Sequence, residues 1–129
     1  MTTALAPAPQ RQLTSFATHA LAPLIRRLAG KTGRTSSYVG KLAGWRSSSA
    51  RWQDVFWGRA RVPADRAENL ATALFLSGQD HADFVMWVQL ARSPDVVALE
   101  LLNLQARAGA TLPPELESWR STAQAKRAA

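Results

Sequence analysis

Apolar residues recur at every third or fourth position along most of this 129-residue chain, and glycine, serine or proline interrupts the pattern at short intervals. A spacing of three and four places side chains on one face of an α-helix, whereas a half-buried strand needs strict alternation, of which the chain has almost none. The interrupting residues are those that begin and end helices. The pattern therefore predicts an all-α protein, of a length that suits one domain with a modest core.

The first three expected helices lie in the N-terminal half. The first begins at Thr14 or Ser15 and is stopped by Gly30 and Gly33. The second covers about 36–43, with Thr35 as its N-cap, Gly44 as its end, and Val39 and Leu42 facing inward. The third runs from the capping serines 47–49 to about Trp57, with its core positions at Trp52, Val55 and Phe56.

Four further helices are expected, at about 63–76, 79–91, 95–108 and 113–119. The helix at 79–91 is apolar around much of its circumference, so it must be covered on more than one side. Ser93 and Pro94 supply an N-cap and a first-turn proline for the helix at 95–108. The expected organisation is a flexible arm (1–13), a main helical domain (14–91), a helical extension (92–120) and a mobile tail (121–129).

Positive charge is concentrated in one half of the chain. Residues 1–66 hold eleven Lys and Arg against Asp54 and Asp65, a net charge of +9, whereas residues 67–129 carry −2. A polyanionic partner would select such a distribution, while a surface charged only for solubility would mix the signs more evenly. The split favours nucleic acid as the partner, with plain solubility as the alternative.

Several other classes of function find little support. The chain has no cysteine, which excludes disulfides, thiolate metal sites and a cysteine nucleophile. Gly30-Lys31-Thr32 lacks the glycine spacing and the preceding strand of a phosphate-binding loop. His81 has acidic neighbours, but successive helical positions do not converge on one metal ion. We expect no enzyme activity, cofactor or metal, no membrane span, and a cytoplasmic location.

Three segments, at 39–44, 48–63 and 67–74, follow one another in the chain with short links. Through these segments, residues 21–76 resemble the Cro and lambda-repressor-like helix-turn-helix family, also called XRE-type. Residues 39–44 (VGKLAG) are similar to the small-residue pattern of the family's second helix. Residues 48–63 (SSARWQDVFWGRARVP) are similar to its serine-capped third helix and following loop, and residues 67–74 (AENLATAL) fit its next helix. The link from Gly44 to Ser48 is about two residues longer than usual. The resemblance implies a bundle of about five helices, with one or two more at the C-terminus.

Such a fold places the helix at about 48–57 in the major groove, where its N-terminal residues read base edges. The candidate base contacts are Ser48, Ser49, Arg51 and Gln53. The candidate phosphate contacts are Lys31, Arg34, Thr35, Ser36, Ser37, Tyr38, Lys41, Arg46, Arg59 and Arg61. The serines could equally act as helix caps alone, and Arg51 or Gln53 could simply be solvated.

The predicted function is a sequence-specific, double-stranded DNA-binding transcriptional regulator, as a repressor. The apolar, near-neutral C-terminal helices favour a homodimer that would match a palindromic operator, unless the helix at 95–108 only folds back onto its neighbour within a monomer. Trp45 and Trp57 either close the small core or stack on a partner. The alternatives are therefore a protein-interaction adaptor and a single-stranded nucleic-acid binder built on the same fold.

Overall fold

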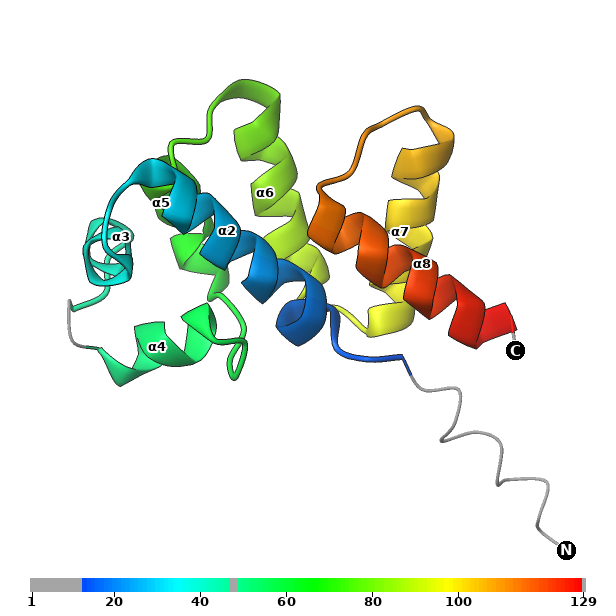
Figure 1. Cartoon of the computed structure of the whole chain (residues 1–129), viewed down its shortest axis with the longest axis horizontal. Helices are drawn as coiled ribbons and strands as arrows, with labels where there is room; N and C mark the ends of the chain where they lie inside the picture. Colours follow the sequence, from blue (N-terminus) through cyan, green and yellow to red (C-terminus); the bar gives the residue numbers. More distant parts are fainter. Residues whose placement is uncertain (1–12, 47–48, 129) are drawn as a thin grey trace, which may run out of the picture.

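The computed structural model describes residues 13–46 and 49–128, and within these ranges it contains helices and turns but no strand, which confirms the all-α prediction (Figure 1). The elements in chain order are the π-helix η2 (Ala17–Leu21), α2 (Ala22–Thr32), α3 (Ser36–Leu42), α4 (Ala50–Phe56), the 3₁₀ turn η3 (Ala64–Arg66), α5 (Ala67–Ala73), α6 (Gly78–Leu90), α7 (Asp95–Arg107) and α8 (Pro114–Ala128). None of these helices is both long enough and apolar enough to cross a membrane.

The first helix, η2 with α2, forms the middle of the molecule. It runs without interruption from Phe16 to Thr32, and its buried Leu24 and Ile25 belong to the hydrophobic core. α3, α4 and α8 all pack against α2. Gly33, with a left-handed φ of 75°, ends the helix, whereas Gly30 lies inside it, so the expectation that Gly30 stops the helix is wrong. One left-handed glycine is enough to end a helix.

The two short helices α3 and α4 begin where their capping residues predict. The Thr35 hydroxyl oxygen accepts a hydrogen bond from the backbone N–H of Tyr38 at 3.1 Å, and the Ser49 hydroxyl oxygen accepts one from that of Trp52 at 3.3 Å. These bonds satisfy N–H groups that have no partner within the helix. The predicted inward position of Leu42 is wrong, since Val39 is buried but Leu42 is 42% exposed.

The helices α5 to α8 complete the bundle. α6 packs against α5, α7 and η2, as its apolar circumference requires. Pro94 is the N-cap of α7, and no side chain caps this helix, so the predicted Ser93 cap is wrong. α8 continues to Ala128, well beyond the predicted end at about Trp119. Residues 121–128 are therefore helical, and Ala123 is buried.

The C-terminal helices share one hydrophobic core with the N-terminal half. Phe16 and Trp119 make an edge-to-face contact with ring centroids 5.1 Å apart, and the Trp119 indole N–H donates to the Thr14 carbonyl at 3.0 Å. The Phe16 backbone N–H donates to the Asp95 carboxylate at 3.0 Å. The elements form an elongated molecule with α3 and α4 at one end and α7 and α8 at the other (Figure 1).

Candidate nucleic-acid interface

α4 presents one apolar and one polar side. Trp52 and Val55 are buried, whereas Arg51 is exposed and Gln53 is partly exposed. This division leaves the two longest polar side chains of the helix available to a partner while the opposite side packs on the core. A helix of seven residues is short enough to lie within the major groove, which is about 12 Å wide.

Trp52 holds α4 against α3. Its indole N–H donates to the Ser36 carbonyl at 2.8 Å, and its ring packs directly over Gly40, where an added Cβ would lie 2.5 Å from the Trp52 ring. Trp45 also packs against this ring, with centroids 5.0 Å apart. α3 and α4 are therefore braced as one unit, although the link 43–49 exceeds the three to four residues usual in a helix-turn-helix.

The four candidate base contacts differ in their positions. Ser48 lies outside the described residues. Ser49 is the N-cap of α4, so its hydroxyl oxygen already accepts a hydrogen bond, although its O–H can still donate one. Arg51 is exposed in the first turn of α4, and Gln53 is partly exposed one residue beyond Trp52. The base-reading hypothesis therefore depends chiefly on Arg51 and Gln53.

Among the candidate phosphate contacts, three arginines are already bonded within the fold. Arg34 donates to the Ala73 carbonyl at 3.0 Å and lies over the Phe75 ring, 3.8 Å from its centroid. Arg59 pairs with Asp54 at 2.9 Å, and Arg61 donates to the Ala91 carbonyl at 2.6 Å. Each therefore contributes to the structure, and Arg59 and Arg61 also remain exposed.

Lys41 and Arg46 are exposed and make no hydrogen bond or ion pair through their side chains to another described residue. Lys41 is in the last turn of α3 and Arg46 is in the link to α4, so with Arg51 they lie on consecutive segments at one end of the molecule. Lys31 is also exposed, but it lies on α2 at the rim of a cleft shared with α6, apart from this group.

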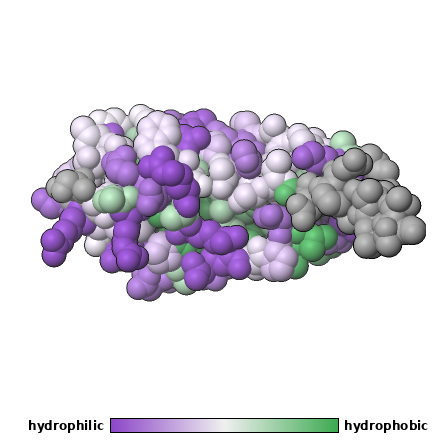
Figure 2. Space-filling model, turned by 90° about the horizontal axis from the view of Figure 1, so that it is seen from below, coloured by the Kyte–Doolittle hydropathy of each residue, from purple (hydrophilic) through white to green (hydrophobic). Residues whose placement is uncertain are grey.

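The start of α3 supplies polar groups at the same end. Thr35 is exposed and caps the helix, and Tyr38 is exposed one turn later. Ser36 and Ser37 are partly exposed. The side of the molecule seen in Figure 2 carries strongly hydrophilic side chains gathered over the half that contains α3 and α4. Such a surface suits a hydrated, charged partner.

Two arginines have structural roles that the sequence did not reveal. Arg26 donates to the Phe56 carbonyl at 2.8 Å and lies over the Trp57 ring, 5.2 Å from its centroid. It thus attaches the C-terminal end of α4 to α2. Arg66 lies over Trp45, 5.0 Å from the ring centroid. Both contacts join residues far apart in sequence, so no local spacing could have indicated them.

The two tryptophans whose exposure the sequence left open behave differently. Trp45 is buried, as expected for a residue that closes the core, whereas Trp57 is 52% exposed. One face of Trp57 contacts Arg26, so its indole is not wholly free for stacking. The described residues contain no group of three or more acidic or histidine side chains arranged to hold a metal ion.

Comparison with known proteins does not show a family for this chain. No family model matches the chain, and no curated protein or solved structure gives a significant match.

Proposed function

We propose that this chain is a cytoplasmic transcriptional regulator that binds double-stranded DNA in a sequence-specific manner and represses by occupying its operator. The observation that carries the proposal is α4, whose buried Trp52 is braced against α3 while Arg51 and Gln53 lie on its outer side. A braced helix with polar side chains near its N-terminus has the form of a recognition helix. The resemblance of residues 21–76 to XRE-type proteins points the same way.

Each side chain has a defined role in this proposal. Arg51 would donate two hydrogen bonds to guanine and Gln53 would bond to adenine, each pair discriminating by about 1–3 kcal/mol. Lys41 and Arg46 would contact phosphates on either side of the groove, and the polar start of α3 would donate to the backbone. The net charge of +9 on residues 1–66 would steer the protein toward DNA.

Fluorescence anisotropy with random duplex DNA across a salt series tests the electrostatic part. Lys41→Ala and Arg46→Ala, which remove proposed phosphate contacts, are each expected to weaken binding and to reduce the slope of log K against log salt by about 0.9. Lys126→Ala removes the same charge from the last turn of α8 and should leave the slope unchanged. Absence of duplex binding at about 50 mM salt would contradict the proposal. Stronger binding to single-stranded DNA than to duplex would favour the alternative of a single-stranded nucleic-acid binder.

Selection of a preferred duplex from a random pool tests base reading. On the selected site, Arg51→Ala is expected to cost about 1–3 kcal/mol and to relax the preference at a guanine, whereas Lys41→Ala should weaken all sequences alike. If no preferred sequence emerges, the protein binds DNA without specificity and the regulator proposal is wrong.

A homodimer through α7 belongs to the same proposal. Leu99 and Leu102 are buried, but Val97, Leu101 and Leu104, at positions i, i+4 and i+7, remain exposed along one row, Leu104 by 52%. α7 thus both packs within the monomer and keeps an apolar stripe. A second copy fits this stripe because an isologous contact pairs the row with itself, and the half of the chain that carries it has a net charge of only −2.

Sedimentation over a range of concentrations tests the dimer. Leu104→Glu is expected to shift the protein to monomer, whereas Leu42→Glu, which changes a leucine of similar exposure on α3, should leave the dimer intact. A monomer at all concentrations, or equal effects of both substitutions, contradicts the α7 interface.

A protein-interaction adaptor is the second candidate, favoured by an apolar patch on α3 and at the end of α5. Tyr38, Leu42 and Phe75 are exposed there, Phe75 by 59% and with a left-handed φ of 64°. A bulky residue in this conformation is uncommon and strained. The adaptor would use this patch together with Arg34. If Phe75→Ala abolished the function of the protein but left DNA binding intact, this result would support the adaptor.

A further inference from the structure

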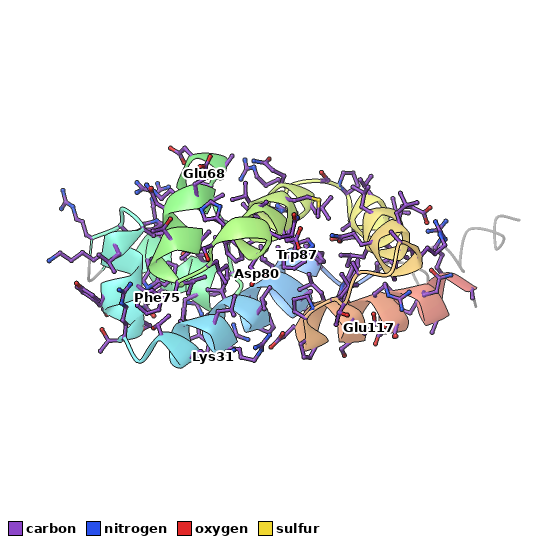
Figure 3. All side chains as sticks on the ribbon, turned by 90° about the horizontal axis from the view of Figure 1, so that it is seen from above. Lys31, Glu68, Phe75, Asp80, Trp87 and Glu117 are labelled. Carbon is purple, nitrogen blue, oxygen red and sulfur yellow. The ribbon has the colours of Figure 1, made fainter. Side chains whose placement is uncertain are left out.

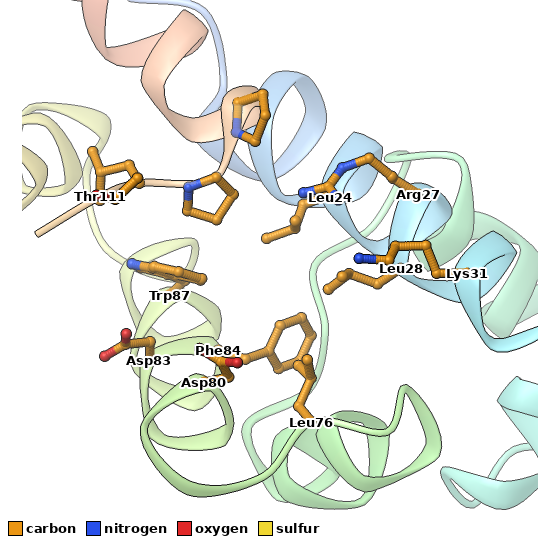
Figure 4. Close-up of a pocket in the computed structure, with 13 residues that line it drawn as sticks. Leu24, Arg27, Leu28, Lys31, Leu76, Asp80, Asp83, Phe84, Trp87 and Thr111 are labelled. Atoms are coloured by element: carbon orange, nitrogen blue, oxygen red, sulfur yellow. The ribbon is translucent and has the colours of Figure 1, made fainter.

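A cleft of about 330 Å³ opens between α2, α6 and the loop that leads into α8. This volume lies at the lower end of the range of small-molecule pockets. Its walls include the apolar side chains of Leu24, Leu28, Leu76, Phe84, Trp87 and Leu112 (Figure 4). The Trp87 indole N–H donates away from the cleft to Gln105 at 3.2 Å, so the ring presents carbon to the cleft. The cleft can therefore hold an apolar group of modest size.

Charged side chains of both signs stand at the rim. Lys31 reaches over the cleft from α2, and Asp80 lies on the opposite wall, on α6 (Figures 3 and 4). Neither side chain makes a hydrogen bond or ion pair to another described residue. The other charged groups are already engaged, because Arg27 pairs with Glu115 through two hydrogen bonds, of 2.5 and 3.1 Å, and Asp83 accepts one from Gln79.

We infer that this cleft binds a small zwitterion with an apolar body, such as a hydrophobic α-amino acid. The carboxylate of the ligand pairs with Lys31, and its ammonium group pairs with Asp80. Its side chain lies against Leu28 and Leu76, which are partly exposed, and against the exposed edge of Trp87. Lys31 would repel a ligand that carries only a positive charge, and Asp80 would repel one that carries only a negative charge. Only a ligand with both charges is therefore matched to both walls. The apolar walls supply most of the affinity, and the two charges supply the selection.

The inference does not depend on DNA binding, because none of the residues that define the cleft lies on α3 or α4. The cleft does lie where the two ends of the molecule meet, since α2 packs against α3, α4 and α8. A ligand held between α2 and the loop before α8 would stabilise the folded protein by mass action.

NMR titration of the full chain, following the Trp87 indole N–H signal assigned with Trp87→Phe, tests the inference with four probes. L-Phenylalanine carries the ring and both charges, 3-phenylpropionate lacks the ammonium group, phenethylamine lacks the carboxylate, and L-alanine lacks the ring. Phenylalanine is expected to bind about tenfold more tightly than each of the others, a difference of about 1.4 kcal/mol.

Two surface substitutions test the separate charges. Lys31→Gln should lower the affinity for phenylalanine to that for phenethylamine, and Asp80→Asn should lower it to that for 3-phenylpropionate. Lys41→Gln and Asp65→Asn, which change exposed residues outside the cleft, should leave the ranking unchanged. Equal affinities for the three aromatic probes, or no shift of the Trp87 signal with phenylalanine at about 10 mM, would overturn the inference.

Discussion

Gly40 is the residue on which the union of α3 and α4 most directly depends. Trp52 fills the space beside it, and the indole N–H reaches the Ser36 carbonyl only because no side chain intervenes. Glycine in a helix costs about 0.5–1 kcal/mol relative to alanine. Here that cost is offset by the buried tryptophan, which both fills the core and donates a hydrogen bond.

Two glycine substitutions separate packing from helix propensity. Gly40→Ala is expected to destabilise the protein by about 1–3 kcal/mol, since the new methyl group would overlap the Trp52 ring. Gly30→Ala is expected to stabilise it by up to about 1 kcal/mol, because Gly30 lies in the helix with nothing within 4 Å of a new Cβ. Urea denaturation measures both, and equal effects would contradict the packing of Trp52 on Gly40.

The ion pair between Arg27 and Glu115 gives stability a dependence on pH. Burial would raise the pKa of Glu115, but its hydrogen bonds from Arg27 and from the backbone outweigh burial and lower it below 4.5. A lowered folded-state pKa means that the pair stabilises the fold above the pKa of the unfolded chain and loses this effect as pH falls through the folded value.

Glu115→Gln is therefore expected to reduce stability by about 0.5–1 kcal/mol at pH 7, a small cost because Arg27 is partly solvated. The deficit should shrink as the pH falls below about 4.5. Urea denaturation from pH 7 to pH 3 measures it, with Glu68→Gln, at an exposed position of α5, as the control. A deficit that stays constant over this range would show that the charge of Glu115 is not responsible.

At the scale of single helices, local chemistry predicted most helix starts and most buried positions, but the cap at Ser93 and the inward position of Leu42 are wrong. Thr35 and Ser49 cap α3 and α4 as expected, because a cap is formed by residues three apart in sequence. Leu42 was assigned to the core from spacing alone, yet it is exposed, whereas Val39 and Gly40 are the buried residues of α3. α3 packs against α2 and α5. Which side of a helix is buried depends on the helices that pack against it, and local spacing does not specify them.

The C-terminal helix α8 also shows what local patterns miss, since here the sequence predicted too little helix. Residues 121–128 are polar and rich in alanine, and without a strong apolar pattern they were expected to form a tail. They are helical because α8 packs along α7, where Arg127 pairs with Glu100 and Gln124 accepts from Asn103. In the candidate site, likewise, Arg51 could be predicted from its place after a cap, whereas the contacts of Arg26 and Arg66 could not.

Substitutions at Ser49 separate capping from DNA contact. Ser49→Ala is expected to cost about 1 kcal/mol of stability through loss of the bond to the Trp52 N–H. Ser49→Asp restores a capping oxygen and should keep the stability, while its negative charge weakens duplex binding. Thermal or urea denaturation, paired with anisotropy, distinguishes the two effects. Equal stability of Ser49→Ala and the unmodified protein would mean that this bond contributes nothing.

At the scale of the whole molecule, charge and shape are distributed along the same long axis. The strongly basic half carries α3 and α4, and the weakly acidic half carries α7 and α8, at opposite ends in Figure 1. The cleft beside Lys31 lies between them. One core joins the two ends, through the contacts of α8 with η2 and of α2 with α3 and α4.

The placement of α7 far from α4 has a consequence for the operator. In a dimer joined at α7, the two copies of α4 stand at the outer ends of the assembly and face the same side of the DNA only when the half-sites are in helical phase. Because one core joins the two ends of each protomer, the dimer fixes both the phase of the half-sites and the distance between them. Adding about 5 bp between half-sites should abolish cooperative binding, and adding about 10 bp, which restores the phase but lengthens the site by one helical turn, should recover it at most in part. A gel-shift series with these spacers measures the effect, and affinity that ignores phase would mean that each protomer binds alone.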